Sequence, residues 1–176
     1  GTHAFNMVEL VTGSNVKKIL SHLNNLYDDN PMDVDANILI QLENGANGTI
    51  RSSQIATGEE NNLRISIYGD KGGLKWEQEN PNYLYHLSDS EPMRVLKTAH
   101  PYNYAISNIS TKIPPGHPEG IFDSMGNIYN GVAKAIKKQK FDSVEFPSID
   151  EGVRGMDFIE KAVKSHQSGN IWMNLD

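Results

Sequence analysis

Between residues 36 and 97, apolar and polar residues alternate in short runs that turn-forming residues separate. A Glu-Asn-Gly-Ala-Asn-Gly segment follows the first run, and Asn-Gly pairs are typical of tight hairpin turns. Strands this closely spaced leave little room for parallel crossovers, so the pattern predicts an antiparallel meander with a polar outer face. Strands are expected at residues 36–42, 49–56, 63–68, 74–79, 83–87 and 93–97.

Helical periodicity predicts helices on both sides of this meander. A short, largely buried helix is expected over residues 4–12, and Gly13 is a suitable C-terminal stop. The strongest helical pattern covers residues 122–138, and Ser148–Glu151 has the form of a capping box that begins another helix. Residues 171–175 are predicted to form a closing strand. The expected fold class is α+β, with a single, mostly antiparallel β-sheet and helices packed on one face.

Residues 16–26 fit two structures. The apolar positions Val16, Ile19, Leu20 and Leu23 have helical spacing and alternate poorly as a strand. Periodicity alone therefore predicts a helix in this segment. A polar connection that contains a proline is expected to follow it over residues 27–35.

Length and composition limit the classes of function. The 176 residues suffice for one domain with a real core and are too few for two domains of ordinary size. A net charge of −6 without a basic stripe argues against nucleic acid as a partner. No apolar run approaches the roughly 20 residues of a membrane helix, so no membrane partner is expected. The lack of cysteine excludes disulfides and thiolate chemistry and fits a cytoplasmic protein.

Two histidines stand where a polar ring could bind a ligand. His3 lies at the start of the predicted helix over residues 4–12, where the helix dipole disfavours a positive imidazole, so a neutral ring could exchange a proton. His117 lies in a stiff loop of prolines and glycine that leads into the helix over residues 122–138. The simpler interpretations are a capping or frayed residue for His3 and a solvated loop residue for His117.

Familiar catalytic motifs are missing from the sequence. No Gly-x-Gly-x-x-Gly follows a strand, no phosphate-binding loop of the Gly-x-x-x-x-Gly-Lys type occurs, and no nucleophile elbow is present. A metal site would need His3, His117 and Glu119 to converge from distant positions. The glycine-rich segment 69–73 has the chemistry of a hairpin turn.

Several segments, taken in order, are similar to one family. They are GTHAFN and ELVTG near the start, NGANGT at 44–49, GEEN at 58–61, IYGDKGGL at 67–74 and GHPEG at 116–120. Their order and spacing resemble the C-terminal domain of the glucose–fructose oxidoreductase, inositol dehydrogenase and MocA-like (Gfo/Idh/MocA) family of NAD(P)-dependent sugar dehydrogenases. The similarity covers nearly the whole chain, and it implies a strand over residues 16–26, against the periodicity.

The resemblance implies a division of labour. Residues 1–176 would be the C-terminal substrate-binding and oligomerisation domain of a dehydrogenase. The N-terminal Rossmann domain, which binds NAD or NADP and carries a substrate-polarising lysine, would be absent from this chain. The chain alone is then expected to bind no cofactor and to be inactive. In the family an Asp-x-x-x-His pair supplies the acid/base; His3 matches its histidine, while its aspartate would precede Gly1.

The resemblance also implies a substrate and partners. The substrate would be a sugar or polyol whose hydroxyl group is oxidised, and His117 would line the substrate cleft. Gln54, Glu59 and Asn62 are candidates for further hydroxyl contacts, although each could equally be an ordinary surface residue. The expected partners are the protein's own Rossmann domain and further copies of the chain, joined through the sheet. The alternatives are a non-catalytic sugar-binding or oligomerisation module and a His/Glu metal enzyme.

Overall fold

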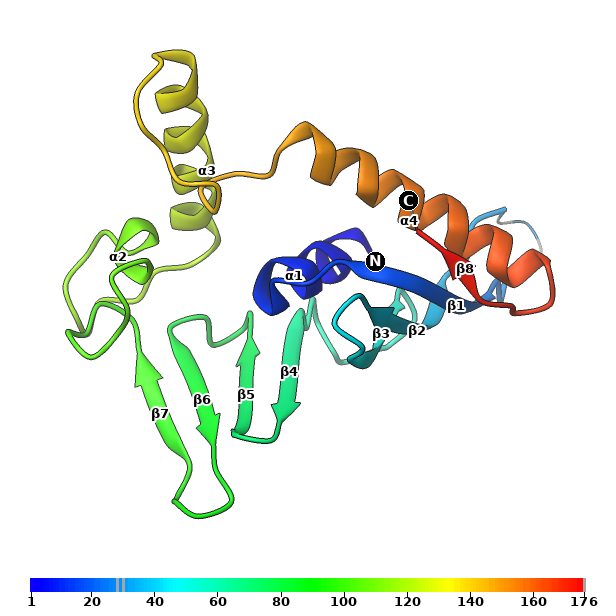
Figure 1. Ribbon diagram of the computed structural model, residues 1–176, viewed down its shortest axis with the longest axis horizontal. Helices are drawn as coiled ribbons and strands as arrows, with labels where there is room; N and C mark the ends of the chain where they lie inside the picture. The colour runs from blue at the N-terminus through cyan, green and yellow to red at the C-terminus, as the bar shows by residue number, and fades with distance from the viewer. Residues whose placement is uncertain (28, 30, 176) are drawn as a thin grey trace. The chain divides into compact units, whose positions relative to one another are not determined.

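The computed structural model describes residues 1–27, 29 and 31–175. The chain divides into two compact units, Gly1–Glu60 with Ser148–Asp176 and Asn61–Pro147. The first unit (Figure 1) contains α1 (Thr2–Thr12), β1 (Val16–Asn24), β2 (Asp35–Leu42), β3 (Asn47–Ser53), α4 (Ile149–Gln167) and β8 (Met173–Asn174). The second contains β4 (Arg64–Gly69), β5 (Gly72–Glu77), β6 (Tyr83–Leu87), β7 (Arg94–Lys97), α2 (Ser107–Ser110) and α3 (Ile121–Ile136).

The first unit is an antiparallel sheet in the order β3-β2-β1-β8, with α1 and α4 packed on one face. The alternation in β2 is confirmed, because every second residue from Ala36 to Leu42 is buried. Phe5 of α1 and Phe158 of α4 stack with ring centroids 4.4 Å apart above this face. The core of the unit is Phe5, Val16, Ile19, Ala36, Ile38, Ile40, Leu42, Ile50, Phe158 and Ala162.

Residues 16–24 form a strand, so the prediction from periodicity was wrong and the expectation from the family resemblance is confirmed. The register of β1 against β2 shifts between Val16 and Lys18, which is a bulge. A bulge adds one residue and moves the side chains beyond it to the other face. Val16, Ile19 and Ser21 are therefore all buried, and the strand loses the simple alternation that would have identified it.

The outer edge of β1 is covered in two ways. The short strand β8 pairs with Lys18 and Ile19. Beyond it, Ser165 Oγ accepts a hydrogen bond from Ser21 N at 2.9 Å, and Asn170 Nδ2 donates to Ser21 O at 2.7 Å. Side chains of α4 and of the turn after it thus satisfy backbone groups that a longer strand would otherwise bind.

The second unit is a meander in the order β4-β5-β6-β7. Each strand pairs with the next through a hairpin, as the turn residues predict. At the first hairpin Gly72 has φ +127°, and a Cβ there would lie 2.3 Å from Leu87 O. The turn between β4 and β5 therefore requires glycine at this position.

The α+β class and the antiparallel pairing are confirmed, while the strands form two sheets instead of the expected single one. Among the described residues β3 and β4 do not pair, and the segment between them has positive φ at Gly58, Glu60 and Asn62. The four-residue helix α2 was not predicted, and β8 is shorter than the expected strand over residues 171–175.

Two further predictions concern membrane helices and the connection over residues 27–35. None of the helices in the described ranges has the length and apolar character needed to cross a membrane. The predicted polar connection over residues 27–35 lies partly outside the described residues.

The segment over residues 137–147, which we call the returning segment, packs back against α3. Glu145 Oε2 accepts a hydrogen bond from Lys134 Nζ at 2.7 Å, and Glu145 Oε1 accepts one from Asp142 N at 3.0 Å. The bond from Lys134, followed by that from Asp142, lowers the pKa of Glu145 below its usual value. Since the folded state has the lower pKa, the carboxylate contributes stability at neutral pH that is lost as the pH falls through this pKa.

Gly131→Ala is expected to destabilise the second unit. A Cβ at Gly131 would lie 2.8 Å from both Glu145 Cβ and Phe146 Cδ1, so the returning segment would have to move. Overpacking of this kind typically costs about 1–3 kcal/mol. Gly126→Ala in the same helix is the matched control, because a Cβ there meets nothing within 4 Å and alanine favours helix by about 1 kcal/mol. Urea unfolding measures both variants, and equal stability would contradict this packing.

Candidate active site

The predicted site residues are divided between the two units. His3, Gln54 and Glu59 belong to the first unit, and Asn62 and His117 belong to the second. All are exposed except Asn62, which is half-buried. The structure therefore defines two sets of candidate residues, one in each unit.

His3 lies in the first turn of α1, two residues before the buried Phe5. Successive helix positions are separated by about 100°, so His3 lies roughly opposite Phe5 around the helix axis. This agrees with the exposure of the His3 ring and the burial of Phe5. The exposed imidazole is therefore carried by an element that is part of the core.

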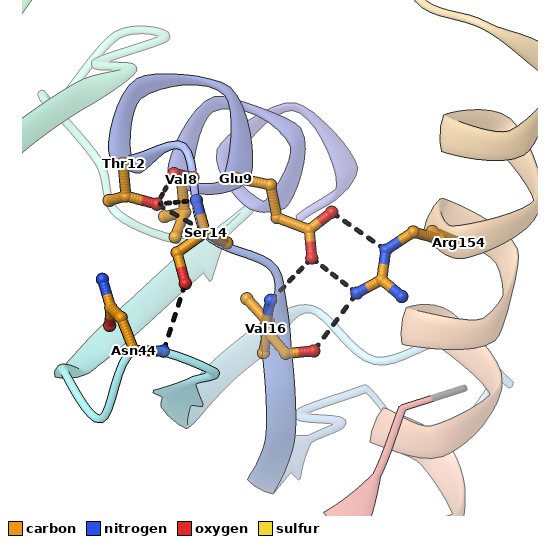
Figure 2. A network of polar contacts seen from close by, with 7 residues as sticks. All are labelled: Val8, Glu9, Thr12, Ser14, Val16, Asn44 and Arg154. Carbon is orange, nitrogen blue, oxygen red and sulfur yellow. Dashed lines mark hydrogen bonds and ion pairs between the residues drawn. The ribbon is translucent and has the colours of Figure 1, made fainter.

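A polar network holds the far end of α1 (Figure 2). Glu9 Oε1 accepts hydrogen bonds from Arg154 Nη2 at 2.6 Å and from Val16 N at 2.7 Å, and Glu9 Oε2 accepts from Arg154 Nε at 3.2 Å. Arg154 Nη2 also donates to Val16 O at 3.2 Å. Hydrogen bonding to Glu9 raises the pKa of Arg154 further. This pair is not recognisable in the sequence, because its members lie 145 residues apart and neither belongs to a motif.

In the second unit, His117 is fixed by the carbonyl of Pro114. The backbone N of His117 donates to Pro114 O at 3.3 Å, and its ring Nδ1 lies 3.2 Å from the same oxygen. A carbonyl oxygen only accepts, so Nδ1 must carry the proton. The neutral ring then has its lone pair on Nε2, where it can accept a hydrogen bond from a hydroxyl group.

The loop that carries His117 is closed at its base. Glu119 Oε1 accepts from Lys112 N at 2.8 Å. The Asn82 side chain binds the backbone of Glu119 on both sides: Nδ2 donates to Glu119 O at 2.9 Å, and Oδ1 accepts from Glu119 N at 3.1 Å. Thr98 Oγ1 donates to the same Asn82 Oδ1 at 3.2 Å. The Glu119 carboxylate, a possible metal ligand from the sequence, is thus bonded to the backbone of its own loop. Across the described ranges no group of three or more potential ligands could hold a metal ion.

The remaining candidates lie around the segment between β3 and β4. The backbone of Gln54 donates to Val34 O at 2.7 Å, and that of Glu59 donates to Ala56 O at 3.1 Å. The backbone of Asn62 donates to Glu79 Oε1 at 2.7 Å. Each backbone is anchored within its own unit, which supports a defined position for these side chains.

Comparison with known proteins identifies the family. Residues 1–75 match the sequence model described as the GFO/IDH/MocA C-terminal domain. The uncharacterized oxidoreductase YfiI of Bacillus subtilis (strain 168) is 30% identical over 99% of this chain and 46% of YfiI. An oxidoreductase structure from Sinorhizobium meliloti is 36% identical, with a TM-score of 0.93, over 98% of this chain and 50% of that one. The chain belongs to the Gfo/Idh/MocA C-terminal domains.

The same fold occurs in a structure whose sequence is less similar to this chain. The structure of an inositol dehydrogenase homolog complexed with NAD+, from Azotobacter vinelandii, has a TM-score of 0.82 at 24% identity, over 99% of this chain and 47% of that one. At this identity the similarity concerns the fold. The Gfo/Idh/MocA domain described here thus spans about half the length of the proteins it matches.

Asn82→Asp is expected to loosen the loop over residues 112–120. The carboxylate keeps acceptors for Glu119 N and Thr98, but it places an oxygen against the Glu119 carbonyl where the amide donated. Loss of such a partner typically costs about 1–3 kcal/mol, so hydrogen exchange in the loop should accelerate about tenfold or more. Exchange measured by mass spectrometry on peptides that cover the loop tests this.

Asn80→Asp is the matched control. The side chain of Asn80 donates to the exposed Glu77 Oε1 at 2.8 Å and does not belong to the loop network. Its substitution should leave exchange over residues 112–120 unchanged. Equal exchange rates in the two variants would show that Asn82 does not hold the loop.

Proposed function

We propose that the chain is the substrate-binding domain of an NAD(P)-dependent oxidoreductase that acts on a sugar or polyol hydroxyl. The observation that carries the proposal is similarity along nearly the whole chain to proteins named as oxidoreductases. The fold shared with the A. vinelandii inositol dehydrogenase homolog is consistent with it. In this proposal His3 accepts a proton from the substrate and His117 binds the substrate.

The proposed reaction consists of a hydride transfer and a proton transfer. The alcohol carbon would give a hydride to the oxidised nicotinamide of NAD or NADP, and its oxygen would give a proton to a base, which leaves a carbonyl group. A base must lie within about 2.6–3.2 Å of the hydroxyl to accept that proton. His3 is proposed as this base, because its imidazole is exposed and histidine is the side chain that most often acts as a general base. His117 is proposed to bind the substrate through its Nε2, with Gln54, Glu59 and Asn62 as further hydroxyl contacts.

The residues of this chain do not fit a dinucleotide site. Both sheets are antiparallel, and the glycine-rich turn Gly69–Gly73 joins β4 to β5. Phosphate binding by such a turn requires a helix N-terminus directly after it. We therefore propose that NAD or NADP binds to a Rossmann domain elsewhere in the intact protein, and the relatives, which are about twice as long, support this. This chain would supply the proton transfer and the substrate contacts, and it would be inactive alone.

His3→Ala in the intact protein is expected to lower kcat by about 10²–10⁴-fold, the usual contribution of a general base. The KM for the cofactor should change little, because the base acts on the substrate hydroxyl. His117→Ala should act mainly on the substrate KM, since a positioning contact is felt in ground and transition states alike. Steady-state kinetics normalised to folded protein measures both.

Thr2→Ala is the matched control for His3, because Thr2 is the neighbouring exposed residue in the same helical turn. It should leave kcat within about twofold of the parent, well below the range expected for a lost base. If His3→Ala also retains turnover within a few-fold, His3 is not the base, and the non-catalytic module becomes the better explanation. A lower melting temperature with unchanged turnover would indicate a structural role for His3.

We also propose that the chain self-associates through the face of a sheet. The register of β4 to β7 puts Tyr68, Tyr83 and Val95 on one face, where they are 68%, 37% and 40% exposed. Exposed apolar and aromatic side chains on one sheet face, here with Lys75 and Lys97 over the Tyr68 and Tyr83 rings, favour a protein partner. Their position on the pleated face indicates contact by face packing.

Analytical ultracentrifugation tests the self-association. The parent should form dimers or larger species at tens of micromolar. Val95→Asp should shift the equilibrium toward monomer, because it puts a charge where a face contact would bury it. Asp70→Asn, in the exposed β4–β5 turn, is the control and should not alter the equilibrium. A monomeric parent at this concentration would contradict the proposal.

A further inference from the structure

Helices α1 and α4 are joined at two places. Phe5 stacks on Phe158 with an interplanar angle of 15°, and Glu9 forms its ion pair with Arg154 at 2.6 Å. The partners on each helix are four residues apart, so they lie on one face of that helix. The two helices therefore run antiparallel. The Phe5–Phe158 and Glu9–Arg154 contacts lie along one line between them, which we call the seam.

The ionic contact is more than a surface salt bridge. The Glu9 and Arg154 side chains are only 12% and 21% exposed, and the guanidinium reaches both carboxylate oxygens. Charge-assisted, two-point pairs of this kind also fix the relative orientation of the groups they join. Because Val16 donates to the carboxylate and accepts from the guanidinium, the contact joins α1, the start of β1 and α4 at one point.

The geometry points to a functional role for this contact: we propose that Glu9 and Arg154 are positioning residues for His3. A helix held at one point can rotate about its axis, whereas two contacts one turn apart fix both its rotation and its position along the axis. His3 lies about 200° around the helix from Phe5, on the side away from the seam. The seam therefore sets the direction in which the imidazole is presented.

This inference rests on the proposed function, in which His3 is the base. A base must be held within hydrogen-bond reach of the hydroxyl, and a displacement of about 1 Å can lower the rate about 10²-fold. Without the ionic contact, α1 would keep the apolar packing of Phe5, Ala4 and Val8 and remain in the core. Apolar packing is non-directional, so the direction of His3 would be held less closely.

The test uses Glu9→Gln and Arg154→Lys in the intact protein. Glutamine loses the charge of the carboxylate, and lysine keeps the positive charge but cannot bridge both oxygens. Each variant should lower kcat by about tenfold or more, with the cofactor KM unchanged. The matched control is Glu160→Gln, which removes an exposed ion pair to Lys164 on the same helix and should leave kcat within about twofold.

A double-mutant cycle separates this inference from the proposed function. If Glu9 acts through His3, Glu9→Gln should cause no further loss of kcat in a His3→Ala background. If His3→Ala itself leaves turnover unchanged, the proposed function fails. If His3→Ala lowers turnover but Glu9→Gln and Arg154→Lys do not, only the positioning role fails.

Two other outcomes would also overturn the positioning role. One is an equal loss of kcat from Glu9→Gln with and without His3, because the effect would then not pass through the imidazole. The other is failure of both Glu9→Gln and Arg154→Lys to fold, measured by thermal unfolding, because the contact would then be required for the fold itself.

Discussion

The first unit depends on the return of α4 to a sheet made from the start of the chain. Phe158 and Ala162 are buried in the core, and Phe158 stacks on Phe5. Loss of a buried aromatic side chain typically costs about 3–5 kcal/mol, a large share of the roughly 5–15 kcal/mol that stabilises a domain. The second unit is inserted between the two segments of the first. The first core therefore cannot close until the whole inserted segment has been synthesised.

This dependence also explains how an exposed side chain can be held in a defined place. His3 is two residues from Phe5, which is 2% exposed, so the helical turn that carries His3 is anchored by the core. His117 is held differently: its ring bonds Pro114 O within the loop, and Asn82 holds the loop through the backbone of Glu119. His3 is thus supported by apolar packing together with the Glu9–Arg154 ion pair, whereas His117 is held by hydrogen bonds, and these kinds of support respond differently to temperature and salt.

The sequence predicted those parts of the fold whose signals are local. The alternation of β2 and the capping box at Ser148 are both present, with Ser148 Oγ accepting from Glu151 N at 3.2 Å. The bulge in β1 hid that strand from periodicity, and only the family resemblance indicated it. The division into two sheets was not predictable, because the alternation of apolar residues identifies a strand but not the strand with which it pairs.

The candidate site was predictable to a similar extent. His3 and His117 could be chosen from their local sequence and the resemblance. Glu9 and Arg154 could not, because a glutamate and an arginine on two separate helices are unremarkable until the fold brings them together. The buried Ser21 illustrates the same limit: its hydroxyl donates to Ala162 O, a partner 141 residues away.

The side chains that cover the outer edge of β1 have a consequence for how this domain meets other chains. An open strand edge is a template on which another strand can add, and it is a common starting point for aggregation and domain swapping. Here Ser165 and Asn170 already occupy the N–H and C=O groups of Ser21, and His166 Nδ1 accepts from Leu23 N at 3.3 Å. A foreign strand could pair along residues 21–23 only after the end of α4 had moved away, which makes this edge resistant to uncontrolled growth of the sheet.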